Sequence, residues 1–269
     1  MAKVIVFDSG VGGLSIAQAI YATNLNHQLI FASDNAAYPY GTKSNLELIP
    51  RVTQVVSRLV EETQADILVV ACNTASTVAL PELRNLLDIE VVGVVPAIKP
   101  AAKLSRNGSI GVLATPATIQ RRYTKDLIER FAPDCQIILM GSSDLVAIAE
   151  KKLHQGQLDA DELELIVQDW LKPECMIDTI VLACTHFPLL TKELDRIFKA
   201  HDKHIHWVDS ATGIANRVGF LSSKLPASQQ ENANENNLAI FTREEAFSSH
   251  FKRVLNQIEI KETQFITME

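Results

Sequence analysis

The chain has 269 residues, of which 47% are hydrophobic and 21% are charged, a composition typical of a soluble globular enzyme. Its formal net charge of −7 argues against a nucleic-acid partner. The charge does not exclude an anionic small molecule, because a pocket can differ in sign from the whole surface. No apolar run approaches the roughly 20 residues of a membrane span, and residues 1–8 lack the pattern of a secretory signal. We therefore expect a cytoplasmic protein without a membrane partner.

Short runs rich in valine, isoleucine and leucine alternate with segments of helical periodicity along the whole chain. This pattern is typical of parallel βα units that are buried on both faces. It predicts an α/β protein with mainly parallel sheets. The predicted strands are 3–8, 28–33, 67–71, 90–94, 109–114, 136–140, 178–183, 204–208 and 238–242.

Helix signals lie between these strands. Ser44 and Glu47 form a capping box, and Pro50 then predicts a break or the start of a second helix. The polar segment from Pro226 to Asn237 lacks periodicity, so we expect a mobile surface loop before a final strand and helix. Apolar residues at helical spacing predict a helix that faces the sheet: Val52, Val55, Val56, Leu59 and Val60.

Two segments of the chain repeat one another. Residues 66–74 and 178–186 match at a constant offset of 112, with Asp, Val, Ala and Cys coinciding. Upstream, Val4–Ser9 and Ile110–Thr115 each form a predicted strand that runs into polar residues. Chance similarity is the alternative, since buried parallel strands all have similar compositions. We favour two lobes of like topology.

Each copy of the repeat contains a cysteine, Cys72 or Cys184, where a predicted strand gives way to a helix. Ligands of open α/β sheets collect at the carboxyl ends of the strands, and a helix N-terminus favours a thiolate. His186 lies two residues beyond Cys184, where it is placed to polarise the thiol or to exchange protons. The cysteines are followed by residues suited to capping a helix, namely Asn73, Thr74 and Thr185.

A buried cysteine most often only fills space in a core, and this interpretation suits Cys135 and Cys175. The paired placement of Cys72 and Cys184 favours chemistry instead. Inverting a stereocentre removes a proton from one face and delivers another to the opposite face, which two bases on opposite walls of a cleft do directly. No two cysteines are spaced as C-x-x-C, so we expect free thiols and no metal site.

Residues 8–13 (DSGVGG) follow the first predicted strand and suggest a dinucleotide-binding loop, with Asp34 near the position of a ribose-binding acid. The fingerprint fails, because Ser15 replaces its third glycine and Asp8 would repel a pyrophosphate. We expect glycines that permit positive φ and a close approach to a small anionic ligand. Asp8 is suited to assist a nearby base, to bind a substrate ammonium group or to cap the next helix.

The loop after the second predicted strand reads YPYG at residues 38–41. Tyr40 and Gly41 are placed to orient a substrate carboxylate. A plain turn explains this loop equally well.

Five motifs, in this order and spacing, resemble those of the glutamate racemase family. The resemblance runs from about residue 3 to the terminal helix and implies an isomerase without a cofactor. Members of the family interconvert L- and D-glutamate without pyridoxal phosphate or metal, and supply D-glutamate for peptidoglycan. The motifs are FDSGVGGLS (7–15), SDNAAYPYG (33–41), ACNTAS (71–76), LATPATI (113–119) and LACTHFPLL (182–190).

The same resemblance implies the catalytic residues. Cys72 would act on the α-proton of D-glutamate, with Asp8 in support. Cys184 would act on the α-proton of L-glutamate, with His186 and Glu150 in support. Substrate binding is implied for Asp8, Ser9, Tyr40, Gly41, Asn73, Thr74, Thr115, Thr118, Thr185 and His186.

The sequence departs from the family pattern at Phe187, where tyrosine is frequent, and at Ala183, where glycine is frequent. Neither departure removes a reacting group. Two alternatives remain: a racemase that acts on aspartate or another amino acid, and a binding module that has lost the chemistry. Two thiols have no purpose in a bare binding module, and a comparison of rates on glutamate and aspartate decides the substrate.

The expected architecture is two pseudosymmetric, doubly wound α/β lobes with the active site in the cleft between them. The first lobe comprises 1–97 with 211–269, and the second comprises 98–210. The expected partner is the small-molecule substrate, glutamate. A homodimer is an open alternative to a monomer.

Overall fold

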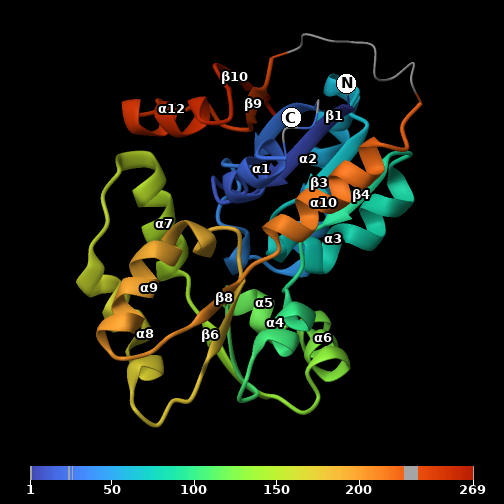
Figure 1. The fold of residues 1–269 in the computed structure, drawn as a ribbon. Helices are drawn as coiled ribbons and strands as arrows, with labels where there is room; N and C mark the ends of the chain where they lie inside the picture. Colours follow the sequence, from blue (N-terminus) through green and yellow to red (C-terminus); the bar gives the residue numbers. More distant parts are fainter. Residues whose placement is uncertain (1, 24, 26, 227–235, 269) are drawn as a thin grey trace.

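The computed structural model describes residues 2–23, 25, 27–226 and 236–268, and it contains two β-sheets flanked by helices (Figure 1). The first part of the chain forms four strands of the first sheet with their helices. These elements are β1 (Ala2–Asp8), α1 (Leu14–Tyr21), β2 (His27–Ser33), the 3-10 turn η1 (Tyr40–Thr42), α2 (Asn45–Thr63), β3 (Ile67–Val70), α3 (Asn73–Leu86) and β4 (Glu90–Gly93). The second sheet and its helices follow as α4 (Ile98–Leu104), β5 (Ser109–Ala114), α5 (Pro116–Gln120), α6 (Arg122–Phe131), β6 (Gln136–Gly141), α7 (Asp144–Gln155), α8 (Ala160–Leu171), β7 (Thr179–Ala183), the 3-10 turn η2 (Phe187–Leu190), α9 (Thr191–Ala200) and β8 (His206–Val208). The chain then returns to the first sheet with α10 (Ala211–Ser222), β9 (Leu238–Phe241), α12 (Ser249–Asn256) and β10 (Glu262–Phe265).

Both sheets are parallel throughout their described pairings. The first has the strand order β10-β9-β2-β1-β3-β4, and the second has the order β6-β5-β7-β8. The chain runs outward in both directions from β1 and from β5, as in a doubly wound fold, so the carboxyl ends of the strands meet at one edge of each sheet. The predicted α/β class with parallel sheets is confirmed.

The second sheet repeats the strand order and register of four strands of the first, β2-β1-β3-β4. Val4 of β1 pairs with Ile67 of β3, and Ile110 of β5 pairs with Thr179 of β7. These pairs are related by the offsets that the sequence repeat predicts, which confirms two pseudosymmetric lobes. The boundaries after residues 97 and 210 stay a prediction.

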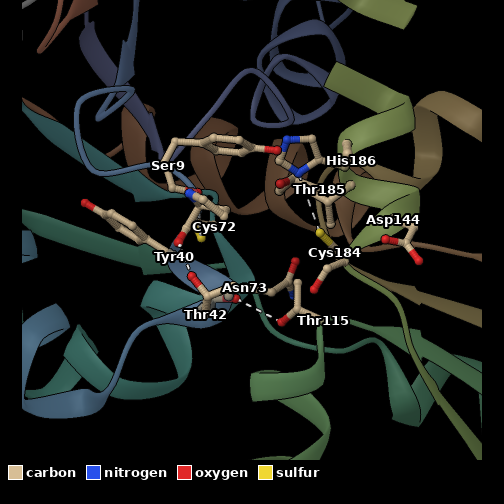
Figure 2. A pocket seen from close by; sticks show the side chains of 17 residues that line it. Ser9, Tyr40, Thr42, Cys72, Asn73, Thr115, Asp144, Cys184, Thr185 and His186 are labelled. Carbon is tan, nitrogen blue, oxygen red and sulfur yellow. Dashed lines mark hydrogen bonds between the residues drawn. The ribbon is translucent and has the colours of Figure 1, made fainter. Parts of the chain in front are cut away.

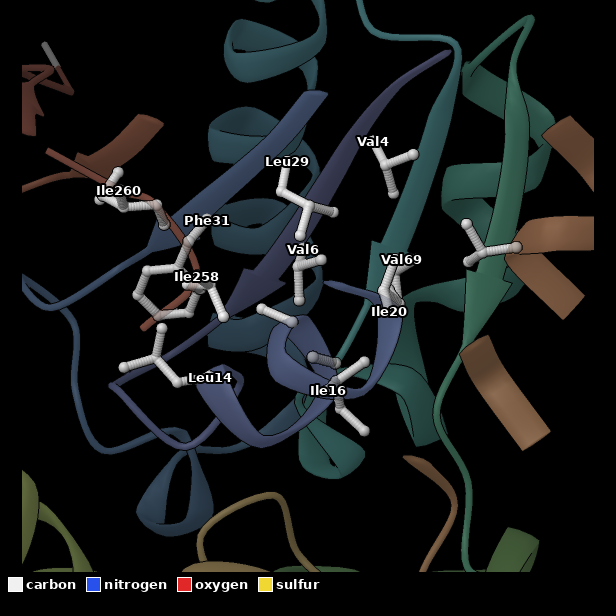
Figure 3. Packing of buried hydrophobic residues seen from close by; sticks show 14 of the residues in the cluster. Val4, Val6, Leu14, Ile16, Ile20, Leu29, Phe31, Val69, Ile258 and Ile260 are labelled. Atoms are coloured by element: carbon white, nitrogen blue, oxygen red, sulfur yellow. The ribbon is translucent and has the colours of Figure 1, made fainter. Parts of the chain in front are cut away.

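Successive side chains of β1 point to opposite faces of the first sheet, and each face is covered by its own hydrophobic core. Val4 and Val6 point toward α1, where they pack with Leu14 and Phe31 (Figure 3). Ile5, on the opposite face, packs against α2. Because both faces are covered, the strand is a continuous apolar run rather than an alternating one. The predicted apolar stripe of α2 faces this second core. Val60 is half-buried, and the other four residues of the stripe are buried: Val52, Val55, Val56 and Leu59.

The predicted break at Pro50 is wrong, because α2 continues through it. Pro50 lies in the second turn, so it removes a single bond, the one to the carbonyl of Leu46. The side chain of Leu46 is 89% exposed, and water reaches this part of the helix. The capping box of Ser44 and Glu47 is present and holds the first turn.

The end of the chain adds a strand that the sequence does not predict, β10 at the edge of the first sheet. Its residues are exposed and mostly polar, so they carry no pattern of alternating burial. Most of the predicted loop from Pro226 to Asn237, namely 227–235, lies outside the described residues. No helix in the described part of the chain is long and apolar enough to cross a membrane.

A buried ion pair anchors the loop between β2 and α2. Asp34 is fully buried, and its two oxygens bind the guanidinium of Arg51 at 2.6 and 2.9 Å. The hydroxyl groups of Tyr40 and Thr242 donate to the same carboxylate, each at 2.6 Å. Burial raises the pKa of Asp34, but these hydrogen bonds outweigh it and hold the pKa below its ordinary value. Asp34 therefore fixes the loop that carries Tyr40.

Replacing Arg51 by Met is expected to lower the free energy of unfolding by about 3–5 kcal/mol, because it leaves a buried carboxylate without its cation. The matched surface variant Arg58→Met removes an exposed pair with Glu62 and is expected to cost less than about 1 kcal/mol. Urea unfolding followed by circular dichroism measures both. Equal losses in the two variants would contradict the anchoring role of Arg51.

Candidate active site

A pocket of about 300 Å³ lies where the carboxyl ends of the two sheets face each other (Figure 2). Cys72 follows β3 and Cys184 follows β7, and the two sulfur atoms lie on opposite sides of the pocket. Each cysteine is 6% exposed. The fold thus brings the two repeated cysteines to one site, each from its own sheet. Of the predicted site residues, those that line the pocket are Ser9, Tyr40, Gly41, Cys72, Asn73, Thr74, Thr115, Cys184, Thr185 and His186.

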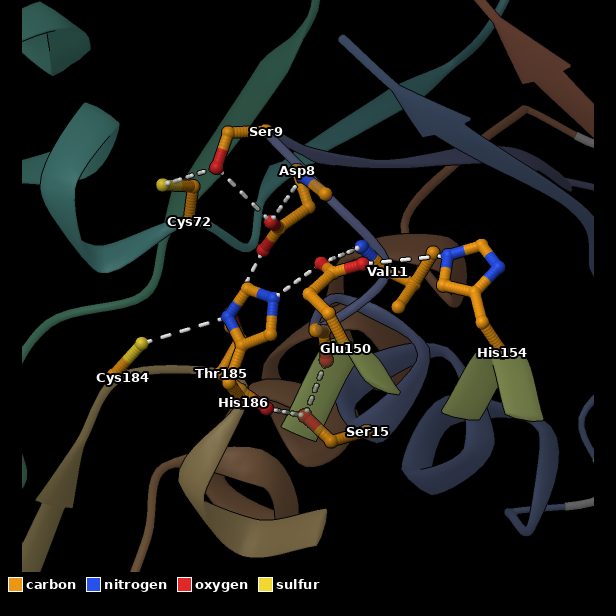
Figure 4. A network of polar contacts seen from close by, with 12 residues as sticks. Asp8, Ser9, Val11, Ser15, Cys72, Glu150, His154, Cys184, Thr185 and His186 are labelled. Carbon is orange, nitrogen blue, oxygen red and sulfur yellow. Dashed lines mark hydrogen bonds and ion pairs between the residues drawn. The ribbon is translucent and has the colours of Figure 1, made fainter. Parts of the chain in front are cut away.

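Cys184 is supported by a histidine and a carboxylate. Nδ1 of His186 lies 3.6 Å from Sγ of Cys184, and Nε2 lies 2.6 Å from Oε1 of Glu150 (Figure 4). The backbone N–H of Val11, from the other lobe, donates to the same Oε1 at 2.8 Å. Burial opposes the charged form of His186, but its bonds to Cys184 and Glu150 outweigh burial and raise its pKa well above the ordinary value. A protonated His186 therefore faces the thiol.

The surroundings of Cys72 are different. Oγ of Ser9 lies 3.7 Å from Sγ of Cys72 and 3.5 Å from Oδ1 of Asp8. Burial, together with the charge of Asp8, raises the pKa of Cys72 to about 12. Burial also raises the pKa of Asp8, which is fully enclosed. Cys72 is therefore held as a neutral thiol.

The expected helix N-termini are present at one cysteine and absent at the other. Cys72 is the N-cap residue of α3, where a hydrogen bond from the backbone of Ala75 lowers its pKa, but burial outweighs this effect and raises the pKa. After Cys184 the chain enters the short turn η2, and α9 begins later, at Thr191. At Cys184, positive charge comes from His186 instead of a helix. Asp8 does not cap α1 either, because the N-cap of that helix is Gly13.

Further hydrogen bonds join the lobes beside the pocket. The hydroxyl of Thr185 donates to Oδ2 of Asp8 at 2.8 Å, and the hydroxyl of Ser15 donates to the carbonyl of Thr185 at 2.9 Å. The hydroxyl groups of Thr74 and Thr115 lie 3.2 Å apart. Asp8 and Thr185 thus link the surroundings of the two cysteines directly.

The glycines of the loop after β1 make room for side chains of the other lobe, and they do not adopt the positive φ that the sequence predicts. Among the described glycines, Gly108 and Gly156 have positive φ, so the prediction of positive φ for Gly10, Gly12 and Gly13 is wrong. A Cβ at Gly10 would lie 2.2 Å from Oε1 of Glu150, and one at Gly12 would lie 2.5 Å from Nδ1 of His186. The missing side chains make room for the groups behind Cys184.

Several predicted residues stand behind the pocket instead of lining it. Asp8 and Glu150 reach it through their neighbours, and Thr118 is fully buried against Thr115. Tyr40 lines the pocket, but it turns its hydroxyl away, toward Asp34. Cys135 and Cys175 are half-buried and lie outside the pocket lining.

Sequence analysis missed a stretch of the wall that includes Ser143 and Asp144 at the start of α7. The available signal was their place after a predicted strand of the second sheet, where ligands collect. Tyr38, Pro39 and Thr42 were also missed, although they flank predicted residues. In the part of the chain that the structure describes, no group of three or more His, Cys, Asp and Glu side chains is arranged to hold a metal ion.

The site offers two thiols to one small ligand, with a cationic imidazole behind one thiol and a serine and a carboxyl group behind the other. Such a pair can take a proton from one face of a carbon atom and return a proton to the other face. These are the fold and site of a racemase that uses two bases, and residues 14–217 match the family model described as Asp/Glu/Hydantoin racemase.

Comparison with individual relatives identifies the family within this class of racemases. The glutamate racemase of Pectobacterium atrosepticum is 49% identical over 222 residues, which cover 82% of this chain and 77% of that protein. The glutamate racemase of Photorhabdus laumondii is 51% identical over 218 residues, which cover 81% of this chain and 75% of that protein. The chain therefore belongs to the glutamate racemase family of isomerases.

Solved structures agree with this assignment. Escherichia coli glutamate racemase, in complex with L-glutamate and the activator UDP-MurNAc-ala, is 41% identical with a TM-score of 0.91. The match covers 99% of this chain and 98% of that one. A glutamate racemase isoform from Bacillus anthracis is 26% identical with a TM-score of 0.80, covering 100% of this chain and 97% of that one.

Replacing Gly12 by Ala is expected to lower the free energy of unfolding by about 1–3 kcal/mol, because the new Cβ overlaps His186. His186 is bonded on both sides of its ring and cannot move aside. The control is Gly213→Ala in α10, where a Cβ meets nothing within 4 Å, and a gain of up to about 1 kcal/mol is expected. Chemical denaturation measures both changes. A Gly12→Ala variant as stable as the native protein would contradict the packing argument.

Proposed function

We propose that the protein interconverts L- and D-glutamate without a cofactor, through Cys72 and Cys184 as opposed bases, and thereby supplies D-glutamate for peptidoglycan synthesis in the cytoplasm. One observation carries the proposal: the two thiols line one pocket from equivalent strand ends of two pseudosymmetric lobes. Membership of the glutamate racemase family supports glutamate as the substrate.

The charges favour a defined resting state. The pKa of Cys72 is about 12, so this residue starts as a thiol. The raised pKa of His186 favours its protonated form, and its Nδ1 lies 3.6 Å from the sulfur of Cys184. We assign the role of the first base to Cys184 because this cation faces it. This state accepts L-glutamate: the Cys184 thiolate removes the α-proton, and the Cys72 thiol delivers its proton to the opposite face. The enzyme is left with a Cys184 thiol and a Cys72 thiolate.

The reverse reaction starts from that second state. The Cys72 thiolate removes the α-proton of D-glutamate, and Cys184 returns a proton to the other face. Between successive turnovers of L-glutamate, Cys184 loses its proton to solvent and Cys72 regains one. A proton held on Asp8 can reach Cys72 through the hydroxyl of Ser9, which lies 3.7 Å from Sγ of Cys72 and 3.5 Å from Oδ1 of Asp8. The raised pKa of Asp8 suits it to hold this proton.

The polar lining supports binding of the two carboxylates. Nδ2 of Asn73 is buried at the pocket and has no hydrogen-bond partner among the described residues, so it is free to donate to a ligand oxygen. We assign substrate contacts to Ser9, Gly41, Asn73, Thr74, Thr115 and Thr185, and we assign Tyr40 and Thr118 to the support of this lining.

Racemisation in deuterium oxide distinguishes a mechanism with two bases from a mechanism with one. With L-glutamate and no added cofactor, the D-glutamate formed early is expected to carry deuterium at Cα, while the remaining L-glutamate keeps its proton. Each thiol handles one face, and Cys72 takes its proton from solvent. Circular dichroism measures racemisation and mass spectrometry measures deuterium. No loss of optical activity, or early deuterium in both enantiomers, would contradict the proposal.

Replacing Cys72 or Cys184 by Ser is expected to slow racemisation by about 10²–10⁴-fold, the usual contribution of a positioned acid or base. The matched controls are Cys135→Ser and Cys175→Ser, which change thiols outside the pocket lining and are expected to leave the rate unchanged. Near-native rates in either active-site variant would refute the two-base assignment. A faster rate on aspartate than on glutamate would refute the substrate.

A further inference from the structure

His154 lies one helical turn after Glu150 on α7, outside the pocket lining. Its Nε2 lies 3.4 Å from Oε2 of Glu150, the oxygen that His186 does not bind (Figure 4). The other oxygen, Oε1, is taken by His186 and by the backbone N–H of Val11. The carboxylate of Glu150 is therefore bonded through both of its oxygens.

We propose that His154 is a positioning residue for Cys184: it holds Oε2 of Glu150, so that Oε1 stays on Nε2 of His186 and Nδ1 of His186 stays on the sulfur of Cys184. The inference rests on the proposed function of Cys184 as a base. It extends the support of that base by one residue, away from the pocket and toward the C-terminal helix.

The charge on Glu150 depends on this arrangement. Burial raises the pKa of Glu150, but hydrogen bonds from His154 and His186 outweigh it and lower the pKa to about 2. An ionised carboxylate in a buried position needs its donors, because an unpaired buried charge is strongly unfavourable. Without His154 the carboxylate keeps its bonds at Oε1 and loses its partner at Oε2, which weakens its hold on His186.

His154 is itself held in place by the C-terminal part of the chain. Its ring stacks on Phe251 of α12, with ring centroids 4.7 Å apart and planes inclined by 22°. Its carbonyl accepts a hydrogen bond from the hydroxyl of Ser248, the N-cap residue of α12. The charged groups that act on it are Glu150 and Glu245, and the hydrogen bond to Glu150 raises its pKa. The ring has one orientation in which to meet Glu150.

A role in packing alone is the competing explanation, since the ring of His154 covers Phe251. Two substitutions separate the explanations. His154→Phe keeps an aromatic ring on Phe251 and removes the donor to Glu150. His154→Gln removes the ring and keeps an N–H group at a similar distance along the side chain. Packing alone predicts that Phe is the better replacement, and positioning predicts that Gln is.

The two cysteines are assayed separately with the two enantiomers of one diastereomer of 3-chloroglutamate. Removal of the α-proton by one base, followed by loss of chloride from the β-carbon, gives an enamine. The enamine becomes an imine, and water hydrolyses it to 2-oxoglutarate and ammonium. This elimination needs one base, so each enantiomer reports on one cysteine. The variants Cys72→Ser and Cys184→Ser establish which enantiomer each cysteine uses, because each variant loses one of the two eliminations.

In His154→Phe, we expect kcat for the enantiomer that depends on Cys184 to fall by about tenfold, the effect of losing a charge-assisted hydrogen bond. Elimination from the other enantiomer is expected to stay within about twofold, because the support of Cys72 by Asp8 and Ser9 is untouched. His154→Gln is expected to recover most of the loss. Urea unfolding of both variants identifies any change in stability.

Other outcomes overturn the proposal. Equal loss for both enantiomers assigns His154 to packing, as does a His154→Gln variant that is slower than His154→Phe. Unchanged kinetics in His154→Phe show that Glu150 needs no second donor. A native protein that neither racemises glutamate nor eliminates chloride from either enantiomer refutes the proposed function itself, which distinguishes that failure from a failure of the positioning role alone.

Discussion

Two carboxylates, one fully buried and one partly buried, belong to different lobes and each accepts a hydrogen bond from the opposite lobe. The geometry of the site depends on this exchange. Asp8 of the first lobe is bound by the hydroxyl of Thr185, and Glu150 of the second lobe is bound by the N–H of Val11. A carboxylate in a protein interior is unfavourable unless its oxygens are bonded. Each lobe therefore completes the bonding of a group that belongs to the other, and the two thiols are held across one pocket.

The duplicated fold gives equal positions to two thiols, and unequal neighbours give them different electrostatic surroundings. At the offset of 106 that relates β1 to β5, Asp8 corresponds to Ala114 and Ser9 to Thr115. At the offset of 112, His186 corresponds to Thr74. The first lobe thus has an acid at the strand end where the second has a methyl group, while the second has an imidazole where the first has a hydroxyl. Because a two-base reaction needs one thiolate and one thiol at its start, this asymmetry is as important as the symmetry that places the sulfur atoms.

Sequence patterns predicted the parts of the fold that follow from burial. Central strands have continuous apolar runs, residues 4–7 in β1 and Ile67–Val70 in β3, and the repeat of 66–74 in 178–186 located both cysteines at strand ends. The exposed strand β10 has no such pattern. Helix α2 continues through Pro50 because the carbonyl that loses its partner belongs to Leu46, a residue that is 89% exposed, and no local pattern expresses this.

Within the site, the residues that touch the pocket were predictable from strand ends and motifs, and the residues behind them were not. His154 and Ser15 act through partners that lie far away in sequence, Ser15 on the carbonyl of Thr185 and His154 on the C-terminal helix. The glycines at 10 and 12 were correctly associated with close approach, but the approaching groups are Glu150 and His186 of the other lobe and not a ligand. The protonation of Cys72 depends on full burial, which the helix signal in its sequence does not reveal.

The contact between the lobes ties proton chemistry to closure of the cleft. Separation of the lobes would remove the Val11 donor from Glu150 and the Thr185 donor from Asp8, and would let water reach both carboxylates. Water would also screen the charge that His186 presents to Cys184, because electrostatic interactions weaken as the local dielectric rises. With the lobes in contact, the N–H of Val11 and the hydroxyl of Thr185 stay on Glu150 and Asp8, and Glu150 stays on Nε2 of His186. The contact that brings the two thiols to one pocket therefore also holds the polar groups behind each of them.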